Sequence, residues 1–259
     1  MDKPKFWSQD TFEISSFAFG LKSRINTKYT TSGSDNTGKC LYSYNEFGFR
    51  GDSIKKEGFR VMSIGCSFTE GVGVNDNETW PAQICKLIPY GINMNFGTGG
   101  RSNDFISRCL LTYYDLIKPN LVLIMYTLPH RREIYTKEGG IEPFIPTMGW
   151  GYLSQTKEGK RIQEIKTELQ NDNEDFINWY KNHQLITLYL ESKNCKWSWN
   201  GSFLNTDYID KNRFDGDYIK FIDIGADGGH PGPKHNISYS EKLYKYLIDN
   251  QQIIKNKII

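Results

Sequence analysis

The sequence predicts an α/β fold in which a mainly parallel sheet lies between two layers of helices, forming a three-layer α/β/α sandwich. Two observations lead to this prediction. Between residues 58 and 130, short apolar runs alternate with helical patterns at the spacing of βαβ units. The run LVLIM at 121–125 is apolar at every position, which is typical of a central parallel strand covered on both faces.

The elements of this region follow in a regular order. Residues 59–64 form the first strand, residues 78–88 a helix with one apolar face, and residues 93–96 a short second strand. Ser102 is a suitable N-cap for a long helix that ends before Pro119, and residues 121–125 are the third strand. Two successive βαβ crossovers make the sheet parallel, with helices packed against it.

The two flanking regions have a different character. Residues 1–57 are polar and broken, so we predict an N-terminal extension of loops and short strands, packed on a domain of residues 58–259. From about 131 to 195 the pattern is irregular, and a Gly/Pro-rich piece precedes a charged helical stretch. We interpret this segment as an insertion after the third strand. A strand at 195–199 and a helix at 238–248 complete the domain.

The insertion contains Phe144, Trp150 and Tyr152, which allow two interpretations. Ligands of open α/β sheets bind outside the carboxyl ends of the strands, so an insertion at that edge can cover the site. Long loops also need a small core of their own, and aromatic residues supply one. The sequence leaves both interpretations open.

Composition excludes several classes of protein. The 32 basic and 30 acidic residues are scattered, so the basic footprint of a nucleic-acid-binding protein is missing. No segment approaches the roughly 18 apolar residues of a membrane span. The N-terminus lacks the apolar core of a secretory signal. We therefore expect a soluble, cytoplasmic protein, whose oligomeric state and membership of a larger assembly stay open.

The sequence favours neither disulfides nor a metal. The five cysteines lie far apart without a C-x-x-C pair, as is typical of reduced thiols. His230 and His235 are close enough to share a metal ion, but the Pro231, Gly232 and Pro233 between them suit a rigid loop better. We expect no metal and no other cofactor.

The stretch SIGCSFTEGVGV places Ser67 directly after the first strand. A turn there exposes the hydroxyl above the sheet edge and leaves backbone N–H groups beside it to bind an oxyanion. The stretch is not a G-x-S-x-G elbow, because Thr69 occupies the second glycine position, and no lysine follows Gly71 or Gly73 as a phosphate-binding loop requires. The alternative role of Ser67 is an ordinary N-cap.

A base for such a serine is present near the C-terminus. Asp227 and His230 are three residues apart in GADGGHPGP, so the carboxylate can orient the imidazole and leave its other nitrogen for Ser67. A lone D-x-x-H also occurs in surface loops. The order of a serine after the first strand, a glycine-rich second loop and a terminal D-x-x-H favours a catalytic triad.

These stretches together resemble the SGNH (GDSL-type) hydrolases. The resemblance covers most of residues 45–247 outside the insertion and rests on SIGCSFTEGVGV with the following ETWP, on NFGTGGRSND and on DGGHPGP. It implies a flavodoxin-like sheet and a triad of Ser67, Asp227 and His230. It also implies an oxyanion hole formed by the N–H groups of Ser67 and Gly100, with Gly97 and Gly99 as close rivals of Gly100.

Two positions depart from the family pattern. Cys66 stands where the first block usually has aspartate, a residue outside the triad. The third block normally supplies an asparagine as oxyanion donor, but here the third strand runs into YTLPHRRE. Thr127 or His130 can stand in for that donor, although His130 also suits a plain loop position. The loss of one such donor costs about a hundredfold in rate.

The resemblance implies a serine ester hydrolase that acts on acyl or acetyl esters of a small molecule or glycan, with O-acetylated carbohydrate as one candidate. The alternative is a catalytically impaired carbohydrate-binding or structural module that retains the fold. Trp150, Trp197 and Trp199 would then stack on sugar rings, whereas the alternation of Trp197 and Trp199 also suits packing within a strand.

Overall fold

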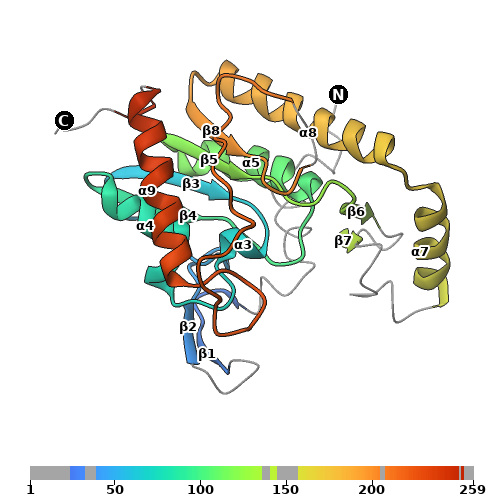
Figure 1. The fold of residues 1–259 in the computed structure, drawn as a ribbon, viewed down its shortest axis with the longest axis horizontal. Coiled ribbons are helices and arrows are strands. Elements are labelled where there is room, and N and C mark those ends of the chain that lie inside the picture. Colours follow the sequence, from blue (N-terminus) through green and yellow to red (C-terminus); the bar gives the residue numbers. More distant parts are fainter. Residues whose placement is uncertain are drawn as a thin grey trace, which may run out of the picture.

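The computed structural model describes residues 24–32, 39–135, 141–144, 157–204, 208–250 and 252–253. Its centre is a four-stranded parallel sheet in the order β4-β3-β5-β8 (Figure 1). The strands are β3 (Phe59–Ile64), β4 (Gly91–Asn95), β5 (Leu121–Met125) and β8 (Lys196–Asn200). The chain leaves β3 toward β4 on one side and returns as β5 on the other, so the strand order reverses between β3 and β5. Ligands of such sheets bind at this reversal.

Helices cover both faces of the sheet. The helices α5 (Asn103–Ile117) and α8 (Asp172–Ser192) pack together on one face, and α4 (Trp80–Leu87) and α9 (Pro233–Asp249) pack on the other (Figure 1). Successive residues of β5 point to opposite sides, with Val122 and Ile124 in the core beneath α5 and Leu123 and Met125 in the core beneath α4. The predicted α/β fold with a mainly parallel sheet is confirmed.

Local side-chain caps explain where the helices begin. The Ser102 hydroxyl accepts the Phe105 N–H at the start of α5, and the Thr79 hydroxyl accepts the Ala82 N–H at the start of α4. A separate turn, η3 (Asp76–Glu78), precedes α4, so that helix starts later than the sequence pattern indicated. In contrast, α9 starts at Pro233, before the expected 238, because proline is well accommodated in the first turn.

The region after β5 contains a helix of the main sandwich. It begins with an antiparallel hairpin, β6 (Arg132–Tyr135) and β7 (Ile141–Phe144), and continues through α7 (Lys157–Leu169) to α8. Trp179, Ile186 and Leu190 of α8 are buried in the core with β5 and β8, so α8 is the crossover helix between these two strands. Phe144 is buried, while Trp150 and Tyr152 lie outside the described residues.

The described N-terminal residues contact the core through buried side chains. The strands β1 (Lys28–Ser32) and β2 (Lys39–Ser43) form an antiparallel pair, and Phe49 packs on Phe96 and Tyr113. The Arg50 side chain, only 1% exposed, pairs with Asp76. Its guanidinium also donates to the backbone carbonyls of Leu41, Glu70, Gly71 and Val74. One arginine thus joins the N-terminal segment to the loop that follows β3.

Within the residues that the structure describes, no helix combines the length and the apolar character needed to cross a membrane.

We expect Arg50→Met to lower the free energy of unfolding by about 3 kcal/mol, because Asp76 and several buried carbonyls lose their donor. Urea unfolding at neutral pH measures the change. Arg161→Met on the exposed face of α7 is the matched control and is expected to stay within about 0.5 kcal/mol of the parent protein. Equal effects of the two substitutions would contradict the anchoring role of Arg50.

Candidate active site

Ser67 occupies the first position of the short helix α3 (Ser67–Glu70), directly beyond the carboxyl end of β3. The turn that leads to it requires glycine at position 65. A Cβ atom there would lie 2.1 Å from the Thr69 hydroxyl oxygen and 2.9 Å from the Met125 carbonyl oxygen. The close contact with β5 therefore fixes Ser67 at the edge where the strand order reverses.

His230 lies between Ser67 and Asp227. Its Nε2 atom is 2.8 Å from the Ser67 hydroxyl oxygen, and its Nδ1 atom is 2.5 Å from Oδ2 of Asp227. A carboxylate that accepts a hydrogen bond from the Nδ1–H group leaves Nε2 free to take a proton from the serine hydroxyl. The structure thus brings together all three residues that the sequence singled out for a triad.

Asp227 has the environment of an ionised carboxylate. Partial burial raises its pKa, but hydrogen bonds from the His230 side chain and from the backbone N–H groups of His230 and Gly229 outweigh burial. The pKa of Asp227 therefore lies below the ordinary value of a carboxyl group. Asp227 remains charged at neutral pH, as is required to stabilise an imidazolium at His230.

The Asp227 loop is docked on the loop that follows Ser67. The Ala226 N–H donates to the Gly73 carbonyl at 2.8 Å, and Gly73 has a φ of +85°. A Cβ atom at Gly73 would lie 2.2 Å from Oδ1 of Asp227. Glycine is required here for both its conformation and its close approach to the carboxylate.

The glycine-rich loop after β4 passes beside Ser67. The Gly97 N–H donates to the Asn95 side chain at 2.8 Å, and the Gly99 N–H donates to Oε2 of Glu70 at 2.6 Å. Within the described chain, the N–H groups of Gly100 and Ser67 have no such partner. Of the three rival glycines, Gly100 is the one whose N–H has no hydrogen-bond partner among the described residues.

Glu70 connects this loop to the N-terminal segment. Its carboxylate is nearly fully buried, and Oε1 accepts hydrogen bonds from the Arg24 guanidinium at 2.9 Å and the Tyr44 hydroxyl at 2.8 Å. The other carboxylate oxygen, Oε2, accepts the hydrogen bond from the Gly99 N–H. No local pattern predicts this role, because a glutamate three residues after the serine is typical of a solvated helix face.

The loop after the third strand makes its described hydrogen bonds with groups other than the triad. Thr127 is buried, and its backbone N–H and carbonyl both pair with the Asn103 side chain. The Thr127 hydroxyl accepts a hydrogen bond from Arg131 at 3.1 Å. Burial lowers the pKa of His130. None of the described hydrogen bonds joins Thr127 or His130 to Ser67, Gly100 or His230.

Other residues considered from the sequence lie in the core. Trp197 and Trp199 are 3% and 1% exposed, so their stacking on sugar rings is excluded and their strand-packing interpretation holds. The Cys66 thiol is buried. His235 accepts the Ile222 N–H and contacts the ring of Tyr218, away from the triad hydrogen bonds of His230. No group of three or more metal-ligating side chains occurs in the described parts of the chain.

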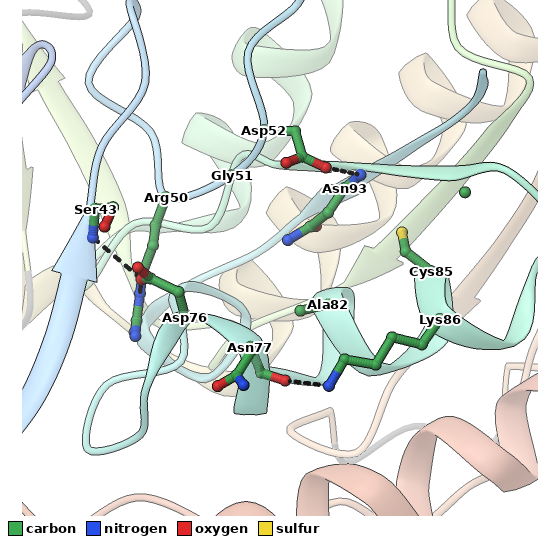
Figure 2. Close-up of a pocket in the computed structure, with 11 residues that line it drawn as sticks. Ser43, Arg50, Gly51, Asp52, Asp76, Asn77, Ala82, Cys85, Lys86 and Asn93 are labelled. Carbon is green, nitrogen blue, oxygen red and sulfur yellow. Dashed lines mark hydrogen bonds and ion pairs between the residues drawn. The ribbon is translucent and has the colours of Figure 1, made fainter. Parts of the chain in front are cut away.

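A separate pocket of about 390 Å³ lies beside β2, η3, α4 and β4 (Figure 2). Its charged groups pair with each other or with backbone atoms. Arg50 pairs with Asp76, the Lys86 ammonium donates to the Asn77 carbonyl, and Asp52 accepts the Asn93 N–H. None of the triad residues lines this pocket. The arrangement suited to chemistry is therefore the one around Ser67.

For an ester hydrolase acting through Ser67, we expect Glu70→Gln to reduce kcat for an activated acetate ester by about tenfold with little change in KM, because the loop carrying Gly100 loses a charged acceptor. Steady-state kinetics give both constants, and thermal unfolding reports stability. Tyr44→Phe, which removes one contact to the same carboxylate but leaves its charge, should have a smaller effect on kcat. A rise in KM alone would contradict this assignment.

Gly73→Ala is expected to lower kcat at least tenfold, because the added methyl group displaces the Asp227 carboxylate from His230. The left-handed backbone at this position adds about 1 kcal/mol of instability. Measurement of kcat together with the unfolding midpoint separates the two effects. Gly229→Ala places a methyl group at an ordinary contact distance of 3.7 Å from the same carboxylate and is the control.

Similarity to known proteins is found among solved structures. No protein-family model and no curated protein matches the chain. Among solved structures, a carbohydrate esterase family 2 enzyme with a carbohydrate-binding domain from Corynascus thermopiles (Myceliophthora fergusii) is 11% identical. That match covers 82% of this chain and 71% of the enzyme, with a TM-score of 0.48.

Two bacterial proteins are similar at the same level. A lipolytic protein of the G-D-S-L family from Desulfitobacterium hafniense is 17% identical over 73% of this chain and 99% of its own, with a TM-score of 0.33. A carbohydrate acetylesterase family member from Sinorhizobium meliloti is 13% identical over 75% and 99%, with a TM-score of 0.35. At these identities and TM-scores, the similarities assign no function to this chain.

Proposed function

We propose that this protein is a serine ester hydrolase with Ser67 as nucleophile, His230 as general base and acid, and Asp227 as the residue that orients His230. The observation that carries the proposal is the continuous hydrogen-bonded relay from Ser67 through His230 to Asp227, at 2.8 and 2.5 Å. Nucleophile, base and orienting carboxylate within hydrogen-bond distance are the signature of an activated serine. The resemblance of the surrounding stretches to SGNH hydrolases also supports it.

Acylation begins when the Ser67 oxygen attacks the ester carbonyl carbon and its proton passes to Nε2 of His230. The carbonyl oxygen becomes an oxyanion, which the N–H groups of Ser67 and Gly100 stabilise. The intermediate collapses by breaking the bond to the alcohol oxygen, and His230 gives its proton to that oxygen. The products are a free alcohol and an acyl group bound to Ser67.

Deacylation repeats these steps with water as the nucleophile. His230 takes a proton from the water as it attacks the acyl carbon, and then returns that proton to the Ser67 oxygen as the acyl bond breaks. A carboxylic acid leaves and the free enzyme is restored. Asp227 stays ionised throughout and stabilises the imidazolium form of His230.

The substrate class that we propose is an acyl or acetyl ester, and an O-acetylated carbohydrate is one candidate. Thr127 is retained as a further oxyanion donor, because its hydroxyl hydrogen is not committed by the hydrogen bond that its oxygen accepts from Arg131. The rival proposal of a non-catalytic carbohydrate-binding module is weakened, since Trp197 and Trp199 are buried and unable to stack on a sugar.

The test is covalent labelling of the nucleophile with a fluorophosphonate, followed by intact-mass spectrometry and peptide mapping. We expect one adduct on Ser67 and none on Ser67→Ala. The same substitution should lower the hydrolysis of 4-nitrophenyl acetate at least about a thousandfold without changing the unfolding midpoint.

Ser102→Ala is a useful control, because this serine caps α5 and lies outside the relay. It should retain the Ser67 adduct while losing about 1 kcal/mol of stability. A folded parent protein that forms no adduct would refute the hydrolase proposal and favour the binding module.

A further inference from the structure

Three phenylalanines from separate segments meet beside the triad. Phe68 directly follows Ser67, Phe203 lies in the loop after β8, and Phe221 precedes the Asp227 loop. The ring centroid of Phe68 lies 4.6 Å from that of Phe203, 6.2 Å from that of Phe221 and 4.9 Å from that of the His230 imidazole. We call Phe68, Phe203 and Phe221 the aromatic wall.

The aromatic wall is anchored on one side and accessible on the other. Phe68 and Phe203 pack against the core beneath α4 and α9, yet all three rings remain only partly buried. The segment that carries Phe221 also exposes Ile222 and Ile224, at 59% and 61%. Exposed apolar groups beside a hydrolytic relay are typical of a surface that receives an apolar ligand.

Two hydroxyl groups near the aromatic wall are already hydrogen-bonded, whereas the buried Nε2 atom of His235, whose ring centroid lies 5.7 Å from that of Phe221, has no partner among the described residues. The Ser202 hydroxyl donates toward the Asn200 side chain and the Gly216 carbonyl and accepts the Tyr218 N–H. The Tyr218 hydroxyl donates to the Asn236 side chain. These two hydroxyls therefore offer a group bound at the wall few new hydrogen bonds, and its contacts are mainly with ring faces and edges.

The position of His230 relative to Ser67 determines which half of an ester lies against the aromatic wall. His230 must protonate the departing alcohol oxygen, so this oxygen lies on the side of Ser67 that faces Nε2. The acyl carbonyl oxygen turns away from it, toward the N–H groups of Ser67 and Gly100. Because the Phe68 ring packs against the His230 imidazole, the aromatic wall borders the alcohol half of the substrate.

We propose that the aromatic wall binds the alcohol half of the ester and selects alcohols that carry a ring with a flat apolar face. This inference rests on the proposed hydrolase function and deepens it by naming the leaving-group class. Aryl and benzyl alcohols present such a face, and so do sugar rings on the side where their C–H groups gather. Phenylalanine contacts both through its ring without hydrogen bonds.

The experiment compares two acetate esters whose alcohols have similar acidity but differ in the ring, benzyl acetate and 2-methoxyethyl acetate. We expect Phe203→Ala and Phe221→Ala each to lower kcat/KM for benzyl acetate by about tenfold, while 2-methoxyethyl acetate changes less than about twofold. An acetylated methyl glycoside forms the third arm. A parallel loss with that ester identifies the sugar ring as the ligand, and its absence restricts the class to aryl and benzyl alcohols.

Two controls separate selectivity from structural damage. Phe176→Ala removes a ring from α8 that is 43% exposed and should leave the ratio of the two esters unchanged. Phe203→Leu keeps apolar volume but loses the flat ring, and should shift the ratio in the same direction as Phe203→Ala. With the alcohol held constant, the preference between 4-nitrophenyl acetate and butyrate should not change in any of these variants.

The outcomes distinguish this inference from the function on which it rests. Suppose that the variants still form the fluorophosphonate adduct at Ser67. Equal losses of kcat/KM for both acetates, or a changed acyl preference, would then overturn the leaving-group assignment. If the parent protein neither labels nor hydrolyses any ester, the hydrolase proposal itself fails. Ligand-observed NMR can detect the binding of benzyl alcohol to Ser67→Ala and so tests the aromatic wall without turnover. The absence of binding would overturn the inference.

Discussion

The whole site depends on the close approach of the β3–α3 turn to its neighbours. Gly65 lies against the Met125 carbonyl of β5, and its own carbonyl accepts the Thr98 N–H from the loop after β4 at 3.1 Å. Three strand ends therefore meet at one residue that has no side chain. Any side chain at Gly65 would separate them, and Ser67, the glycine-rich loop and the β5 loop would no longer share one edge of the sheet.

A second constraint comes from buried charge. The Glu70 carboxylate is almost fully removed from water, and it is satisfied by a guanidinium, a phenol and a backbone N–H from three different segments. Hydrogen bonds of this kind are strong in a buried environment, and leaving one of the groups unpaired is costly. The N-terminal segment thereby supports the candidate active site, through Arg24 and Tyr44 at one end and Arg50 at the other.

The sequence predicted the parts of the site that follow from local position. Ser67 was predictable because it directly follows an apolar strand, and Asp227 with His230 because their spacing suits one turn of backbone. A helical stretch was predicted at α8, but its place in the main sandwich was harder to recognise. The helix buries Trp179 and Leu190 yet exposes Leu188 at 64%, so its apolar residues mark no single face. The hydrogen-bond partners of Glu70 and the contacts of Phe68 with Phe203 and Phe221 depend on tertiary structure. No spacing along the chain predicts them.

The hydrogen-bonded relay also requires that the site assembles late in the synthesis and folding of the chain. Ser67 and His230 are 163 residues apart, and α9, which follows His230 directly, packs on α4 near the start of the domain. Contacts of such long sequence separation form only after the intervening chain has been synthesised and has closed into a loop. A nascent chain that has not yet emerged beyond Pro231 therefore carries Ser67 as an ordinary alcohol. Under the proposed function, Ser67 becomes reactive only after His230 has reached it in the completed fold.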